Sequence, residues 1–477
     1  MLAATSTRGL PARRVVTPVL LALIFLVSLP AVTARIYASD EVLYFSFLRS
    51  VWFDHDLSFE NEYQWFYDHG VSATPGFHET YLERTTETGL RLNFGTIGCA
   101  LLWAPFYAVG DLVARGLHAA GRNVTVDGYS RPYVVAVAYG SALYGFLSVL
   151  LSAAIVRHMA RWWPALATED GLAALIVWLG TPLVFYMYIA PPMAHATSAF
   201  AVAAFLLCWL RIRDTWSVRG MALLGALAAV LAMVREQDAF FVVAPAIDFL
   251  WTLARRRDVR PVQAVSAAVV GAVVAGIVYL PQAWAYTALN GHVGPSHLVA
   301  RKMTWSAPHA LEVLVSPEHG FFLWTPLAFI AALGLVALAW RLAPEARIVL
   351  VGLIAAMALQ VYVGGSVESW TVAGAFGQRR FVATTAVLTV GMAAVLAIGA
   401  EPRWRRWATT VVVVLAMWWN IALMVQFGAG WMDRQRLNLQ AVAYNTFVAV
   451  PRALPGLAWR YLSDRSSFYQ SRRAVTP

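Results

Sequence analysis

The chain has 477 residues, of which 60% are hydrophobic and only 13% are charged, and its formal net charge is +10. Ordinary soluble domains have about a quarter charged residues, so this composition excludes a soluble globular protein and predicts an all-α polytopic membrane protein. Nearly all of the positive charge is arginine, with Lys302 the only lysine, and such an excess fits the cytoplasmic loops of a membrane protein better than nucleic-acid binding.

Apolar segments recur along the whole chain and predict about 11–12 hydrophobic helices. In chain order they fall at residues 15–34, 94–114, 133–156, 171–190, 192–210, 218–234, 238–254, 262–287, 320–340, 346–364, 381–399 and 407–426. Several are rich in small residues, as in VSAAVVGAVVAGIVYL at 265–280, and small residues let membrane helices approach closely. We expect one integral domain over 1–426, followed at 427–477 by an interfacial tail that is too polar to span.

Clusters of arginine between these segments predict the orientation of the chain. They lie at 8–14, 157–161, 211–219, 255–260, 341–347 and 403–406. The positive-inside rule puts them, and the N-terminus, on the cytoplasmic side of the membrane. The use of arginine in place of lysine, with the richness in alanine and valine, indicates a GC-rich bacterial genome, so we expect this membrane to be a bacterial inner membrane. Residue 93 is then outside and the cluster at 157–161 is inside, so the chain crosses the membrane an odd number of times between them. Only one of the two apolar segments in this interval can therefore span the membrane. We therefore expect the segment 94–114, which glycine and proline interrupt, to be re-entrant or to lie at the interface.

The loop 35–93 is the largest predicted soluble element, and the orientation places it on the extracytoplasmic side. It holds 10 of the 26 acidic residues and the aromatic run YQWFY at 63–67. Its stretches 40–53 and 58–68 are predicted to form short amphipathic helices on the membrane surface. The two cysteines, Cys99 and Cys208, both lie in apolar segments, which argues against a disulfide framework.

Two adjacent carboxylates, Asp40 and Glu41, open this loop directly after the first apolar segment. A carboxylate at this place could act as a general base that takes a proton from an acceptor hydroxyl, and a pair could also bind a divalent cation. The alternative is a helix N-terminus, in which Ser39 or Asp40 is the cap and Glu41 lies in the first turn. The sequence holds no nucleotide-binding loop and no metal-spaced His/Cys cluster, so it identifies no cofactor and no metal ligands.

In the order of its short motifs, the chain resembles the GT-C superfamily of membrane glycosyltransferases. After the acidic pair come LRLNFGTIGCALLWAPFY at 90–107, GTPLVFYMYIAPPMAHATSAF at 180–200, MVREQDAFF at 233–241, HGFFLWTPL at 319–327 and GAFGQRRF at 374–381. The similarity is to enzymes that use polyprenyl-phosphate sugars, such as the protein O-mannosyltransferases and the aminoarabinose transferases that modify lipid A, in a bacterial branch of the group. It covers nearly the whole chain.

This resemblance implies a function for the acidic pair. Asp40 falls where the family has its catalytic base, with Glu41 beside it. The enzyme would move a sugar from a polyprenyl-phosphate donor to an acceptor hydroxyl at the extracytoplasmic membrane face, with inversion. NFGTIG stands where some branches carry a Lys-Pro-Pro run near the lipid phosphate, and no large soluble domain follows the last apolar segment. The sugar and the acceptor, whether lipid, glycan or protein, therefore stay open.

An anionic phosphate at the membrane surface favours arginine as its partner, because a planar guanidinium binds phosphate through two hydrogen bonds. The candidates for binding the substrate or its phosphate are Arg235, Arg379, Arg380, His195, Glu368 and Lys302. Each of these residues also has a purely structural explanation: the adjacent arginines as membrane anchors at a helix end, Arg235 in an ion pair with Glu236, and His195 as a histidine that caps or packs at a turn. The tryptophan beside Glu368 could equally belong to the interfacial aromatic belt.

Two other functions stay open on the sequence. A flippase or transporter for lipid-linked glycans would also need arginines and polar loops on this side, but it would need no carboxylate base and should show internal repeats. A non-catalytic membrane assembly protein would use the acidic loop to bind a partner.

Overall fold

The computed structural model describes residues 16–372, 374–465 and 467. In these residues seven helices are long and apolar enough to cross a membrane, and four shorter apolar helices accompany them, eleven in all. Shorter helices connect them, and the only β structure in the described part of the chain is a pair of isolated β-bridges, Thr85 with Arg91 and Met303 with Val367. The protein is therefore an all-α, multi-pass membrane protein, as its composition predicted.

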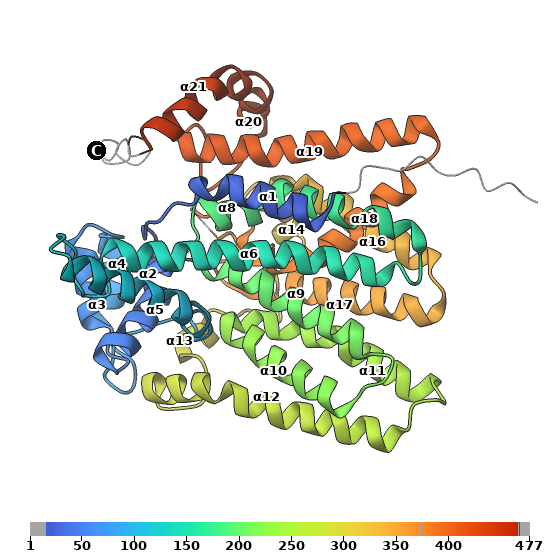
Figure 1. Ribbon diagram of the computed structural model, residues 1–477, viewed down its shortest axis with the longest axis horizontal. Coiled ribbons are helices and arrows are strands. Elements are labelled where there is room, and N and C mark those ends of the chain that lie inside the picture. The colour runs from blue at the N-terminus through green and yellow to red at the C-terminus, as the bar shows by residue number, and fades with distance from the viewer. Residues whose placement is uncertain (1–15, 373, 466, 468–477) are drawn as a thin grey trace, which may run out of the picture.

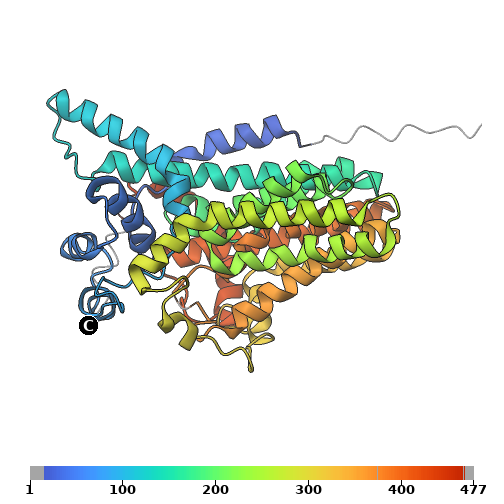
Figure 2. The same ribbon diagram turned by 90° about the horizontal axis from the view of Figure 1, so that it is seen from below.

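The long spans are α6 (Arg131–Met159), α9 (Ala194–Ile212), the span Glu236–Arg255 that contains α11 (Val243–Arg255), α12 (Pro261–Asn290), α17 (Pro344–Ser366), the span Arg379–Ile398 that contains α18 (Thr385–Ile398), and α19 (Arg403–Ala429). The shorter apolar helices are α1 (Pro18–Ser28, extended by a 3-10 turn to Ala31), α7 (Asp170–Gly180), α10 (Val218–Val234) and α16 (Pro326–Arg341). They lie side by side and form the bundle that runs horizontally in Figures 1 and 2.

Two predicted segments are broken by proline. The segment 171–190 divides into α7 and α8 (Leu183–Tyr188), with Pro182 just before α8. The segment 320–340 divides into α15 (Phe321–Trp324) and α16, which begins at Pro326. Proline lacks the backbone N–H that a continuous helix needs, so it is favoured at the start of a new one. The first predicted segment began at Val15, which lies outside the described residues.

The arginine clusters that the structure describes gather at one end of the bundle, which we call the arginine end. They lie at 157–161, 211–219, 255–260, 341–347 and 403–406, in the connections α6–α7, α9–α10, α11–α12, α16–α17 and α18–α19 (Figure 1). The loop 35–93 and the C-terminal helices lie at the opposite end, which we call the loop end (Figure 2). The cluster at 8–14 lies outside the described residues.

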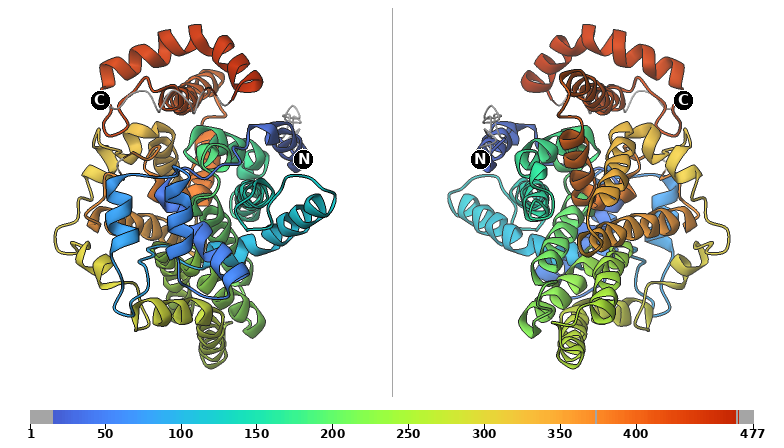
Figure 3. Two further views of the ribbon diagram at one scale, coloured as in Figure 1. Left: turned by 90° about the vertical axis from the view of Figure 1, so that its left-hand side faces the viewer. Right: turned by 90° about the vertical axis from the view of Figure 1, so that its right-hand side faces the viewer.

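The segment 94–114 forms most of α5 (Gly98–Ala119), a helix that is not among the eleven apolar helices. It starts at the loop end, slants away from the bundle, and the chain returns to the loop end to begin α6 (Figures 2 and 3). Tyr144 of α6 donates a hydrogen bond to the carbonyl of Leu102 (2.9 Å). The chain therefore leaves and rejoins the bundle at the same end.

The loop 35–93 packs on the bundle as an aromatic cap. It contains α2 (Ser39–Arg49), α3 (Glu60–Asp68) and the single turn α4 (Pro75–Phe77). Buried rings of α2 and α3 meet edge to face, as between Phe45 and Phe66 (centroids 6.0 Å apart). Arg49 donates to Glu62 (2.8 Å) and pairs with Asp54, which ties the two helices together.

Smaller helices complete the loop end. They are α13 (His297–Arg301), α14 (Glu312–Val315), α20 (Leu439–Tyr444) and α21 (Val450–Ser463). In Figures 1 and 3, α20 and α21 lie beside α19 at the edge of the molecule. Trp459 and Leu462 of α21 are largely exposed.

Small residues set the closest helix approaches. A Cβ atom added to Gly225 of α10 would lie 1.9 Å from the carbonyl oxygen of Gly271 in α12. Gly225 therefore has no room for a side chain. The two helices approach this closely because both positions are glycine, as in other close-packed membrane helices.

Candidate functional site

A polar cavity of about 150 Å³ lies at the loop end, where segments far apart in the sequence meet. Its lining is Asp40, Leu43, Tyr44, Phe94, Gly95, Met193, His195, Arg235, Arg379 and Arg380. Five of the eight residues that the sequence singled out therefore surround one space. They come from α2, from the first turn of α9, from the end of α10 and from the segment that leads to α18.

Asp40 lies in the first turn of α2, and its carboxylate faces the cavity. Its Oδ2 atom lies 2.5 Å from Nη1 of Arg379, and the two side chains are 40% and 23% exposed. This ion pair connects the first loop to the loop before α18. The carboxylate is accessible to solvent and to a ligand, as a general base must be.

Glu41 has a different environment, although it is the next residue. Its side chain is fully buried, and Oε2 accepts hydrogen bonds from the backbone N–H groups of Tyr37 (2.7 Å) and Ala38 (3.1 Å). Glu41 therefore caps the start of α2 from its first turn, as the structural alternative expected, but the N-cap position is Ala38 and not Ser39 or Asp40. Burial raises the pKa of Glu41 to about 8, although the two N–H groups and Arg35 act in the opposite direction. Glu41 does not line the cavity.

Arg379 and Arg380 begin the 3-10 turn Arg379–Thr384, and hydrogen bonds fix the loop before it. The buried Gln378 amide donates to the carbonyls of His319 (3.3 Å) and Trp370 (2.9 Å). Nη2 of Arg380 donates to the carbonyl and the hydroxyl oxygen of Ser369 (3.3 and 3.0 Å). With both arginines held in this way, their guanidinium groups reach the same cavity from adjacent positions.

Arg235 caps the C-terminus of α10, in an extended conformation that turns the chain toward the cavity. Its Nη1 atom donates to the carbonyl of Arg380 (3.5 Å), and Gln237 donates to the same carbonyl (2.9 Å). The expected alternative was an ion pair with Glu236. Glu236 instead accepts a hydrogen bond from the hydroxyl of Tyr286, so Arg235 is oriented by the neighbouring backbone and lines the cavity.

His195 lies in the first turn of α9 and is almost completely buried. Its ring packs edge to face against Tyr186 (centroids 4.5 Å apart), whose hydroxyl donates to the carbonyl of Phe376 (3.0 Å). Within the described part of the chain, Nδ1 of His195 has no hydrogen-bond partner. A buried polar atom without a partner at a cavity wall is suited to bind a ligand atom.

Lys302 and Glu368 are not among the lining residues. The backbone N–H of Glu368 donates to the carbonyl of Lys302 (2.8 Å), so the two residues lie on adjacent strands of chain, and both side chains are exposed. The Lys302 ammonium lies 5.4 Å from the ring centroid of Phe94. Because Phe94 lines the cavity, Lys302 belongs to its rim rather than to its wall.

Sequence reasoning missed Tyr44 and Phe94. Tyr44 follows Asp40 by four residues in α2, a spacing that places both on the same helix face. That spacing was the available signal. Phe94 lies in an irregular stretch, where no periodicity indicates the direction of a side chain.

The charges around the cavity are unequal: three guanidinium groups face one carboxylate. Such a surplus of positive charge in a partly buried space favours an anion with several oxygen atoms, such as a phosphate. Among the described residues, no group of three or more His, Cys, Asp or Glu side chains is arranged to hold a metal ion. No family model and no curated protein matches this sequence.

Proposed function

We propose that this protein is a membrane glycosyltransferase that moves a sugar from a polyprenyl-phosphate donor to an acceptor hydroxyl. The observation that carries the proposal is the convergence of one accessible carboxylate, Asp40, and three guanidinium groups on one cavity. A base and an anion-binding group are the two functions that such a transfer requires at the reacting atoms.

Arg235, Arg379 and Arg380 bind the donor phosphate in this proposal. Negative charge grows on the phosphate oxygen as its bond to the sugar breaks, and preorganised cations stabilise that charge in the transition state. His195 adds a polar ring atom at the wall of the cavity. The arginine geometry that suits phosphate binding also makes lysine a poor replacement.

Asp40 takes the proton of the acceptor hydroxyl. The acceptor oxygen forms a bond to the anomeric carbon while the bond from that carbon to the phosphate oxygen breaks, and the polyprenyl phosphate leaves. The proton goes to the carboxylate, so charge and atoms balance in a single displacement that inverts the anomeric centre. Before the donor binds, Asp40 is paired with Arg379. A phosphate competes for that guanidinium and leaves the carboxylate available to the acceptor.

The position of the cavity supports an extracytoplasmic reaction. It lies at the loop end, opposite to the arginine clusters. The positive-inside rule assigns such clusters to the cytoplasm, so the cavity would open at the outer face of a bacterial inner membrane.

The test is sugar transfer by the purified protein in lipid vesicles. It is given a panel of polyprenyl-phosphate sugars with glycolipid, glycan and peptide acceptors, and products are identified by mass spectrometry. We expect transfer from one donor with release of polyprenyl phosphate and an inverted linkage. Movement of an intact donor across the vesicle membrane without transfer would overturn the enzyme proposal in favour of a flippase.

A further inference from the structure

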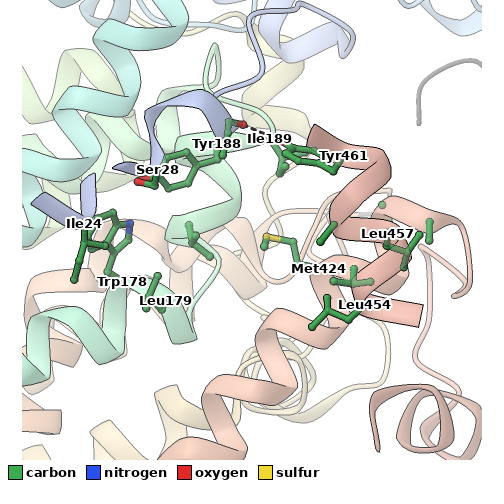
Figure 4. Close-up of a pocket in the computed structure, with 16 residues that line it drawn as sticks. Ile24, Ser28, Trp178, Leu179, Tyr188, Ile189, Met424, Leu454, Leu457 and Tyr461 are labelled. Atoms are coloured by element: carbon green, nitrogen blue, oxygen red, sulfur yellow. Dashed lines mark hydrogen bonds between the residues drawn. The ribbon is translucent and has the colours of Figure 1, made fainter. Parts of the chain in front are cut away.

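A second recess, an apolar groove of about 390 Å³, opens between α1, α8, α19 and α21 (Figure 4). Trp178 of α7 lines it as well, together with Ile24, Tyr188, Met424, Leu457 and Tyr461. The lining hydroxyl groups are engaged: those of Ser28 and Tyr188 bond to each other (2.7 Å), and that of Tyr461 donates to the carbonyl of Ala31 (2.8 Å). The groove therefore presents an almost purely apolar surface.

The surroundings of the groove identify what fills it. The outward faces of α1 and α19 expose large aliphatic side chains, such as Val27 (81%) and Val414 (55%). In a multi-pass membrane protein such faces contact lipid hydrocarbon. A groove between two of these helices is open to the same hydrocarbon. Apolar recesses also exclude water, so a lipid chain is the natural occupant.

A cation lies at the rim of the groove. The Arg465 guanidinium stacks on the ring of Tyr461 (4.4 Å from the centroid) and donates to the carbonyls of Val32 (3.2 Å) and Pro30. The Pro30 carbonyl lies in the 3-10 turn that ends α1 and the Val32 carbonyl directly follows it, so Arg465 lies where the chain leaves the bundle. At that depth a membrane protein meets lipid phosphates, and arginine binds phosphate through several N–H donors.

The groove is separate from the three-arginine cavity, because the two share no lining residue. Val184 and Tyr188 line the groove, whereas Tyr186 packs against His195 of the cavity. The Phe185 ring of α8 stacks on Phe376 (centroids 4.6 Å apart). An occupant of the groove would therefore contact none of the three arginines of the cavity.

We propose that this groove is a binding site for one acyl chain of an anionic phospholipid, with the lipid phosphate at Arg465 and α21 covering the chain. Leu454 and Leu457 of α21 supply one wall, while Trp459 and Leu462 on the same helix are exposed. The bound lipid would hold α21 against α1 and α19. This inference does not depend on the enzyme proposal.

Native mass spectrometry of the full-length protein tests the inference. The protein is reconstituted in vesicles of phosphatidylglycerol and phosphatidylcholine at equal amounts and then transferred to detergent. We expect one retained phosphatidylglycerol per chain. Leu457→Trp fills the groove and should abolish retention, whereas Leu462→Trp, on the exposed side of α21, should not.

The headgroup is tested in the same way. Arg465→Gln should keep a lipid but lose about tenfold in preference for phosphatidylglycerol over phosphatidylcholine, whereas the exposed Arg452→Gln should keep the preference. Thermal unfolding of each variant shows that it is folded. Retention by Leu457→Trp equal to that of the wild type, an unchanged preference in Arg465→Gln, or displacement of the lipid by added polyprenyl phosphate would overturn the inference.

Discussion

Nη1 of Arg379 lies 2.5 Å from Oδ2 of Asp40, and this ion pair joins the first loop to the loop before α18. Two more guanidinium groups, from Arg235 and Arg380, face the same cavity. The carboxylate therefore neutralises only part of the local positive charge. A phosphate that enters the cavity meets a site that is already assembled, which is the preorganisation that electrostatic catalysis requires.

Replacement of Asp40 tests its role as the base. We expect Asp40→Asn to lower kcat about 10²–10⁴-fold, the usual contribution of a general base. Affinity for the donor should not fall, because Arg379 loses its carboxylate partner and becomes more available to phosphate. The measurement is steady-state transfer together with equilibrium binding of polyprenyl phosphate.

Asp68→Asn is the matched control, since Asp68 is an exposed acid of the same loop whose carboxylate accepts a hydrogen bond from the Gln64 side chain. It should leave transfer unchanged. Full activity in Asp40→Asn would remove Asp40 from the mechanism while leaving the cavity as the binding site.

Replacement of a cavity arginine by lysine should weaken binding of the donor. Arg235→Lys keeps the charge but loses the planar fork, so one charge-assisted hydrogen bond worth about 1.5–3 kcal/mol is lost, or about 10–100-fold in donor affinity. Binding of labelled polyprenyl phosphate measures this change. Arg341→Lys, at the arginine end, should bind as the wild type does. If both variants bind equally well, Arg235 is a structural residue only.

The raised pKa of Glu41 predicts that the stability of the protein, rather than its catalysis, depends on pH. Burial raises its pKa to about 8 from 4.5 in the unfolded chain. Between these values the folded state holds the proton that the unfolded state releases. The free energy of unfolding therefore falls as pH rises from about 4.5 to about 8, by up to about 1.4 kcal/mol per pH unit, and is level above that range.

Glu41→Gln removes this titration and should abolish that part of the fall, so that the variant gains stability relative to the wild type near pH 8. Unfolding temperatures in detergent across this pH range provide the measurement. Glu60→Gln replaces an exposed carboxylate of the same loop and should keep the wild-type slope. A wild-type slope in Glu41→Gln would show that another group is responsible.

Composition and apolar periodicity predicted the membrane class and most of the helices, because both follow from local sequence. The breaks at Pro182 and before Pro326 were missed, since apolarity continues across them and only the proline marks the boundary. The two acids 40 and 41 could not be told apart, because the direction of each side chain depends on the local turn that places Glu41 under the backbone N–H groups of Tyr37 and Ala38.

The candidate site was predicted as separate residues and not as a cavity. Arg235, His195 and the arginine pair at 379–380 each stood out as polar groups beside apolar segments. Their meeting around Asp40 depends on the packing of α2, α9, α10 and α18, which no local pattern encodes. Lys302 and Glu368 stood out for the same reason, but they lie at the rim of the cavity or beyond it. A sequence pattern does not indicate how deeply a loop residue is buried, so these two could not be separated from the lining residues.

The orientation can be tested with introduced cysteines. Both native cysteines are buried, so a single exposed cysteine reports its own side of the membrane. In intact spheroplasts we expect an impermeant maleimide to label Asp68→Cys at the loop end, and to label Arg257→Cys at the arginine end only after lysis. The wild type should stay unlabelled in both conditions. The reverse pattern would place the cavity in the cytoplasm and remove the extracytoplasmic reaction.

The contact between α10 and α12 predicts a strict size limit at Gly225. A Cβ atom there would lie 1.9 Å from the carbonyl oxygen of Gly271, which is backbone and cannot rotate away. We expect Gly225→Val to separate the helices and to lower the unfolding temperature in detergent, with a cost of at least about 1–3 kcal/mol. Gly276→Val, in α12, introduces the same β-branched side chain where nothing lies within 4 Å, so it should unfold near the wild-type temperature. Equal stability of the two variants would mean that the helices do not cross at these glycines.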